Sequence, residues 1–77
     1  MQKLKQDLNI GRTIRKLRQA RNMTQQHVTL KMNLLGLSIS RSTYAKIEVG
    51  CMNIKISELK ALKIIFDVEY NDFFKDI

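Results

Sequence analysis

Apolar residues return along the chain at a spacing of three and four positions, the pattern of helices with one buried face. Ile10, Ile14 and Leu17 predict a first helix over about residues 10–21, with Asn9 as its N-cap. The outer face of this helix carries basic side chains, which an ordinary solvated helix surface would also explain. They are Arg12, Arg15, Lys16 and Arg21.

A second helix is predicted after Thr24, a residue well suited to cap a helix start. Val28 and Met32 lie on one face of it, and it ends near Leu34. Residues 35–39 show no periodicity, and the glycine among them permits a positive φ. We therefore expect a turn there, with its apolar side chains tucked inward.

A third, short helix is predicted over about residues 41–49, capped by Ser40. Tyr44 and Ile47 mark its inward face, and Gly50 stands where a helix commonly ends with a left-handed residue. A loop over residues 51–55 follows.

The last third of the chain predicts a fourth helix whose inward face is marked by Leu59, Leu62 and Phe66. A final short turn over about residues 70–75 offers two phenylalanines to the core or to a partner. With no proline and only three glycines, an all-α fold follows, a compact bundle of about five short helices. We expect one domain over residues 9–77, preceded by a flexible segment over residues 1–8.

Charge is distributed unevenly along the chain, whose net charge is +7. Residues 1–47 hold ten Lys and Arg against one acidic residue, whereas residues 48–77 hold four against six. A basic half suggests a face turned toward a polyanion, with nucleic acid first and an anionic membrane second. The first helix lacks Trp and Phe on its apolar side, which argues against membrane binding. No signal peptide or membrane span is recognisable, so we expect a cytoplasmic protein.

Enzymatic and metal chemistry find no support in the sequence. Cys51 is the single cysteine, and His27 has no partner at ligand spacing, so His27 is interpreted as a surface residue. Paired carboxylates, a nucleophile with its base and a phosphate-binding glycine loop are all missing. We therefore predict no enzyme, no metal, no cofactor and no small-molecule ligand.

Two short helices joined by a glycine-containing turn, the second with basic residues on its outer face, describe a helix-turn-helix formed by helices 2 and 3. The chain resembles the Xre family, whose DNA-binding domain is of the Cro and lambda-repressor type, over about residues 9–74. The matching segments are Ile10-Gly11, Ile14-Arg15, Leu17-Arg18, Arg21, Met23-Thr24-Gln25, Ile39-Ser40-Arg41-Ser42-Thr43, Tyr44-Ala45-Lys46-Ile47-Glu48 and Gly50.

Three features depart from the family's common pattern, one of them His27, which stands where an acidic residue often completes a capping box. The interval between Thr24 and Glu48 is longer than in the family's commonest form, with the excess at residues 33–38, and we interpret it as a lengthened second helix and turn. Lys63 stands where the family usually has a small apolar residue, which leaves the packing of the fourth helix open.

Contacts to the DNA backbone are expected at the start of the second helix. Gln25 and Gln26 lie where free backbone N–H groups and the positive helix end favour a phosphate. The resemblance implies that Gln25 clamps the DNA backbone there. Ser40 has two interpretations, a phosphate donor or simply a helix cap.

Base contacts are expected from the outward face of the third helix. Arg41 can pair with O6 and N7 of a guanine, and Lys46 can reach a base edge or a phosphate. Ser42 is ambiguous in its base preference. Thr43 contacts the backbone in the family, but it is equally well explained as helical surface.

The resemblance also implies a structural role for Arg18 and Glu48. In the family the matching residues form a partly buried ion pair that ties the first helix to the end of the third.

The leading interpretation is a regulator that binds double-stranded DNA, a repressor acting as a homodimer on a two-fold operator. Whether the dimer forms in solution or only on the DNA is left open by the sequence. Ile64, Phe74 and Ile77 are spare apolar groups that could cover each other across the two-fold axis or fold back onto their own core. The alternative is an antitoxin-like or adaptor module whose C-terminal third binds a protein partner.

Overall fold

The computed structural model describes residues 10–75, and within them the chain is helical with no strand. The elements are α1 (Ile10–Ala20), α2 (Gln25–Leu34), α3 (Arg41–Glu48), α4 (Ile56–Phe66) and the short 3-10 helix η2 (Tyr70–Phe73). The predicted all-α fold is therefore confirmed, with four α-helices and a 3-10 turn. The segment expected over residues 1–8, and Asn9 as a cap, lie outside the described residues.

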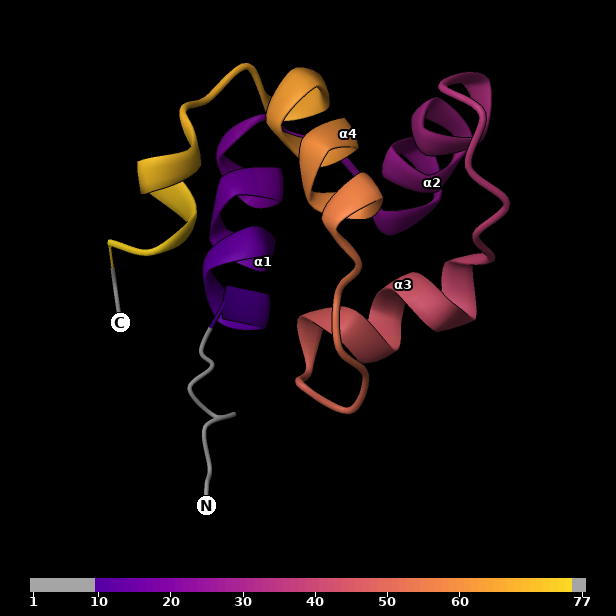
Figure 1. The fold of residues 1–77 in the computed structure, drawn as a ribbon, viewed down its shortest axis with the longest axis horizontal. Coiled ribbons are helices and arrows are strands. Elements are labelled where there is room, and N and C mark those ends of the chain that lie inside the picture. The colour runs from indigo at the N-terminus through magenta and orange to yellow at the C-terminus, as the bar shows by residue number, and fades with distance from the viewer. Residues whose placement is uncertain (1–9, 76–77) are drawn as a thin grey trace.

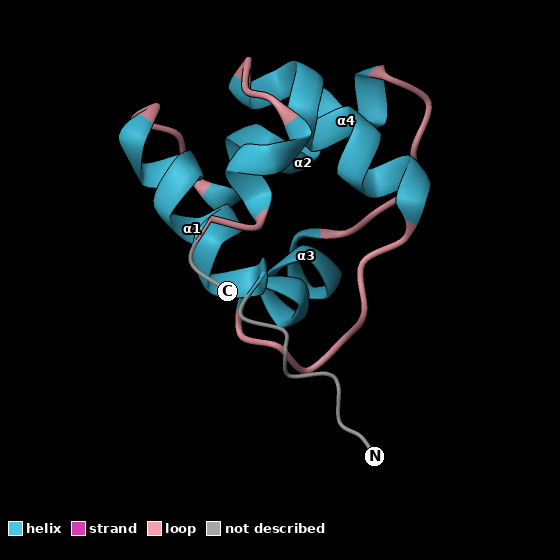
Figure 2. Cartoon of the chain, turned by 60° about the vertical axis from the view of Figure 1, so that its left-hand side comes forward, coloured by secondary structure: helices cyan, strands magenta, loops and turns pink. Residues whose placement is uncertain are grey.

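The helices are arranged so that α3 lies across one end of the others (Figure 1). It packs against both α1 and α2, while α4 packs against α2 and η2 packs against α1. A second view shows α3 below α2 and α4 (Figure 2). None of the helices within residues 10–75 is long and apolar enough to cross a membrane.

The starts of the helices follow from their capping residues. The Oγ1 atom of Thr24 accepts a hydrogen bond of 3.0 Å from the backbone N–H of His27. The Oγ atom of Ser40 accepts one of 3.1 Å from the backbone N–H of Thr43. Both bonds satisfy a donor that the first helical turn leaves without an intrahelical partner, and they confirm the two predicted N-caps.

The four α-helices end in the same way, with a residue at positive φ. The φ values are 57° at Asn22, 95° at Gly36, 83° at Gly50 and 56° at Asp67. In each case the next residue donates its backbone N–H to a carbonyl five positions earlier, as Cys51 does to Lys46 at 2.8 Å. The two glycine ends were predicted. Those at Asn22 and Asp67 were not, because Asn and Asp enter this region less freely than glycine.

The core is assembled from all the helices. Its buried apolar residues are Ile14, Val28, Met32, Ile39, Tyr44, Ile47, Ala61, Leu62, Phe66 and Phe73. Leu37 and Leu59 are partly buried and pack against this cluster. The inward faces predicted from spacing are thereby confirmed.

Helices α1 and α3 approach each other most closely at Gly11. A Cβ atom at this position would lie 2.4 Å from the carbonyl oxygen of Ile47 and 2.7 Å from that of Glu48. Both atoms belong to backbone and cannot turn aside. Only glycine therefore lets the end of α3 lie against α1 as it does.

Arg21, one of the basic residues on the outer face of α1, is exposed but makes specific contacts. Its Nε atom donates to the carbonyl oxygen of Phe66 at 2.6 Å, and Nη2 donates to that of Asp67 at 3.2 Å. These carbonyls end α4, where a cation also interacts well with the helix dipole. Arg21 therefore ties the end of α1 to the end of α4.

Lys63 is accommodated at the edge of the core. It is half-buried, and its Nζ atom lies 5.4 Å from the centre of the Tyr70 ring. An ammonium group over an aromatic face is attracted by the ring electrons. The charge thus stays near the surface while the stem packs.

Candidate nucleic-acid interface

The inward side of α3 fixes how the helix is presented. Tyr44 is fully buried, and Ile47 and Glu48 are 2% and 5% exposed. These three residues lie on one face and leave the opposite face outside the domain.

The outward side of α3 carries the residues predicted to read DNA. Arg41, Ser42 and Lys46 are exposed. Ser42 and Lys46 are four positions apart, so they lie one helical turn from each other on the same face. Arg41 is the first residue of the helix.

Val49 extends this outward face and was missed by the sequence reasoning. It lies seven positions, about two turns, after Ser42 and its side chain is 69% exposed. The helical spacing alone could have identified it. It was overlooked because an apolar residue at a helix end usually belongs to the core.

Ser40 and Thr43 are tied to each other. Besides accepting from the backbone of Thr43, the hydroxyl of Ser40 donates to Thr43 Oγ1 at 3.1 Å. Its oxygen also lies 3.2 Å from Ser42 Oγ. The capping interpretation of Ser40 therefore accounts for its side chain in this structure.

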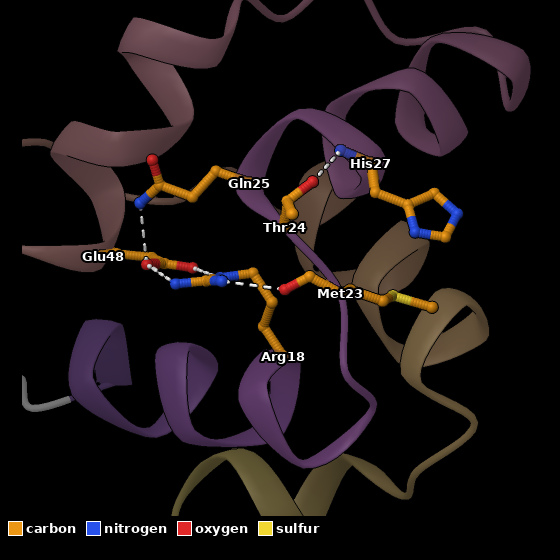
Figure 3. A network of polar contacts seen from close by, with 6 residues as sticks. All are labelled: Arg18, Met23, Thr24, Gln25, His27 and Glu48. Atoms are coloured by element: carbon orange, nitrogen blue, oxygen red, sulfur yellow. Dashed lines mark hydrogen bonds and ion pairs between the residues drawn. The ribbon is translucent and has the colours of Figure 1, made fainter.

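Arg18 and Glu48 form a bidentate ion pair between α1 and the last turn of α3 (Figure 3). The Nε atom of Arg18 lies 2.7 Å from Oε2 of Glu48, and Nη2 lies 3.2 Å from Oε1. The side chains are 12% and 1% exposed. The Nη1 atom also donates to the carbonyl oxygen of Met23 at 2.9 Å, which holds the chain just before α2.

This pairing shifts the pKa values of both groups. Burial by itself would raise the pKa of Glu48, but hydrogen bonds, those from Arg18 and Gln25 among them, outweigh it and leave that pKa lowered. The hydrogen bond to Glu48 raises the pKa of Arg18. Burial, and then the Glu48 carboxylate, raise the pKa of Tyr44. Glu48 and Arg18 are therefore held charged.

Gln25 joins this pair from the first position of α2. Its Nε2 atom donates to Oε1 of Glu48 at 3.0 Å, and the side chain is half-buried (Figure 3). Gln26 is exposed beside it. Sequence reasoning placed Gln25 at the helix start but missed this contact.

Other candidate groups have simple surroundings. His27 is exposed, and Figure 3 shows its ring turned away from Gln25 and Glu48. Cys51 is exposed just after α3. Residues 10–75 contain no group of three or more His, Cys, Asp or Glu arranged to hold a metal ion.

Apolar side chains remain exposed in the C-terminal third. Ile64 on α4 is 65% exposed, and Phe74, just after η2, is 48% exposed, whereas Ile77 lies outside the described residues. A shallow pocket of about 240 Å³ lies beside Ile64. Its lining residues are Leu35, Leu37, Ser57, Lys60, Ala61 and Ile64.

Comparison with known proteins gave one finding. A family model described as helix-turn-helix (HTH_3) matches residues 14–73, which include all of α2, α3, α4 and η2 and most of α1. Neither the curated proteins nor the solved structures gave a match.

Proposed function

The chain belongs to the helix-turn-helix family of DNA-binding regulators of the Xre, Cro and lambda-repressor type, and we propose that it reads a specific sequence with α3 in the major groove. The observation that carries the proposal is the division of α3 into a buried face and an outward face. The outward face offers Arg41, Ser42 and Lys46. The major groove of B-DNA is wide enough to admit such a helix.

Arg41 and Lys46 supply the base contacts in this proposal. As the first residue of α3, Arg41 can extend its guanidinium beyond the helix end toward O6 and N7 of a guanine. Lys46 reaches a base edge or a phosphate. Ser42, between Arg41 and Lys46 in the sequence, contributes the hydroxyl of a short side chain. Thr43 is assigned to the edge of the interface because it is half-buried.

Contacts to the DNA backbone come from the start of α2. No hydrogen bond within residues 10–75 uses the backbone N–H groups of Gln25 and Gln26, and the positive end of the helix dipole adds attraction for a phosphate. The side-chain amide of Gln25 lies beside these backbone groups, at the start of α2. We assign Ser40 to capping, with a phosphate contact as its secondary role.

We further propose that the protein acts as a repressor, bound as a symmetric dimer. One small domain with three or four reading side chains has little surface for specific binding, and a second copy supplies more. The exposed side chains of Ile64 and Phe74 support an interface formed by the C-terminal third. Half-sites would then lie about 34 Å apart, one turn of DNA. The same proposal places the protein in the compartment that holds the DNA.

Selection of bound duplexes from a random pool, followed by a salt series on the best sequence, tests the DNA-binding proposal. We expect a two-fold symmetric sequence and an affinity that falls steeply with salt, because phosphate contacts release counterions. An affinity independent of salt, or a pool with no enriched sequence, would contradict it.

Analytical ultracentrifugation with and without the selected duplex tests the dimer. We expect two chains for each full site. One chain bound to a full palindromic site would contradict the dimer while leaving DNA binding intact.

A second candidate function is an antitoxin-like or adaptor module that binds a protein through the C-terminal third. The pocket beside Ile64 and the exposed Phe74 ring favour it. Co-expression with the product of the neighbouring reading frame tests this candidate. A complex that withstands Ile64→Asp would contradict binding at this surface.

A further inference from the structure

The carboxylate of Glu48 is shared between two partners from different helices. Oε2 accepts from Arg18 Nε at 2.7 Å, and Oε1 accepts both from Arg18 Nη2 at 3.2 Å and from Gln25 Nε2 at 3.0 Å. Glu48 is the last residue of α3, and Gln25 is the first of α2. One buried group therefore links the proposed reading helix to the proposed phosphate contact.

The carboxylate also determines which way round the Gln25 amide lies. A charged carboxylate only accepts hydrogen bonds, so the amide must turn its nitrogen toward Glu48. Figure 3 shows Nε2 of Gln25 facing Glu48 and the amide oxygen on the opposite side. The nitrogen carries two hydrogens, and the second has no acceptor among residues 10–75.

Further free donors lie beside this amide at the start of α2. The backbone N–H groups of His27 and Val28 are both occupied by Thr24. Those of Gln25 and Gln26 donate to no acceptor within the described part of the chain. The second amide hydrogen of Gln25 and the backbone N–H groups of Gln25 and Gln26 can together donate hydrogen bonds to the oxygens of one phosphate.

We propose that Glu48 is a positioning residue for DNA, one that orients the amide of Gln25 so that its second N–H meets a backbone phosphate. This inference rests on the proposed function. Arg18 completes the arrangement, because a lone carboxylate near a phosphate would repel it. With its charge compensated at 2.7 Å, Glu48 can orient Gln25 without that cost.

Glu48→Gln is the informative substitution because it keeps the shape of the side chain. In this variant the side-chain amide oxygen at position 48 accepts hydrogen bonds from the Arg18 guanidinium. The NH₂ group at position 48 then faces Gln25. Gln25 must then present its own oxygen to that NH₂ group. The amide of Gln25 is reversed, and its N–H groups leave the start of α2.

A double-mutant cycle on DNA affinity tests the inference, using Glu48→Gln, Gln25→Ala and both together, on a duplex of arbitrary sequence. We expect Glu48→Gln to weaken binding roughly ten- to a hundredfold when Gln25 is present, the range for one hydrogen bond to a charged group. In the Gln25→Ala background it should cause no further loss. Gln19→Ala, an exposed position on α1, is the matched control.

Equal losses in both backgrounds would overturn the inference, because Glu48 would then act on the fold in general. An unchanged affinity with Gln25 present would overturn it as well. Failure of the wild-type protein to bind any duplex is a different result, and it would overturn the proposed function together with the positioning role.

Nuclear magnetic resonance of the wild-type protein gives a second test that does not depend on the stability of a variant. We expect duplex DNA to move the resonance of one Nε2 hydrogen of Gln25 while the hydrogen bonded to Glu48 stays near its free position. Equal movement of both hydrogens, or of neither, would overturn the inference.

Discussion

The two sides of α3 differ in whether their charged side chains already have partners. On the buried side, Glu48 accepts hydrogen bonds from Arg18 and Gln25. On the outward side, the side chains of Arg41 and Lys46 make no hydrogen bond or ion pair with any other residue in the range 10–75. The contrast separates two tasks of one helix. Its buried side determines where the helix lies, and its outward side is left available for a ligand.

The largest effect is expected when the buried side is broken at its ion pair. Arg18→Ala or Glu48→Ala leaves one charge uncompensated, so each should lower the free energy of unfolding by ~3–5 kcal/mol if the pair behaves as fully buried. The double substitution should cost less than the two single losses added together. Urea denaturation of the wild type, the two single variants and the double variant measures the four unfolding free energies. Additive losses would mean that the two side chains are not energetically coupled.

Gly11→Ala tests the same side through packing alone. The added Cβ meets the backbone oxygens of Ile47 and Glu48, so α1 and α3 must move apart. We expect a loss of about 1–3 kcal/mol in unfolding free energy, the range for overpacking. Thermal denaturation beside Gln19→Ala, an exposed control on the same helix, measures it. If both variants melt like the wild type, the close approach of the helices is wrong.

Arg41→Ala tests the outward side and should leave the buried side untouched. Its unfolding free energy should stay within ~0.5 kcal/mol of the wild type. Its affinity for the selected duplex should fall by ~1–3 kcal/mol, with specificity relaxed at one base pair in each half-site. Gln25→Ala should instead weaken all sequences alike. Equal losses of Arg41→Ala on selected and random DNA would contradict its role as a base reader.

The smallest effect is expected from pH, and it again separates the two sides. The pKa of Glu48 is lowered from its ordinary value of 4.5, so its contribution to stability is complete above that value. The contribution is lost as the pH falls through the lowered pKa. Melting temperatures between neutral pH and about pH 3 should therefore fall more steeply for the wild type than for Glu48→Gln. Parallel profiles would contradict the assigned shift.

Local features of the fold could be predicted from the sequence because their causes are local. Thr24 and Ser40 begin helices through bonds to residues three positions away, and Gly50 ends one at a left-handed position. The faces of α3 follow in the same way from a period of 3.6 residues. The expected reading residues Arg41 and Lys46 are exposed for that reason.

Contacts between distant residues could not be predicted in the same way. Arg21 binds the carbonyl oxygen of Phe66, and a backbone carbonyl leaves no mark in a sequence. The bond from Gln25 to Glu48 joins residues 23 positions apart, and it depends on how α2 and α3 cross. The Arg18 pair was expected only because the chain resembles a family.

The way α3 ends has a practical consequence for experiments on this protein. Cys51 is the single cysteine of the chain and is exposed, and its backbone N–H is held by the carbonyl oxygen of Lys46 at 2.8 Å. A thiol-reactive fluorophore would therefore attach at one defined point, with its anchor fixed to the last turn of the helix. Because the backbone rather than the thiol makes that bond, labelling should leave the helix end intact. The label would report whatever approaches the C-terminal end of α3 without any engineered cysteine.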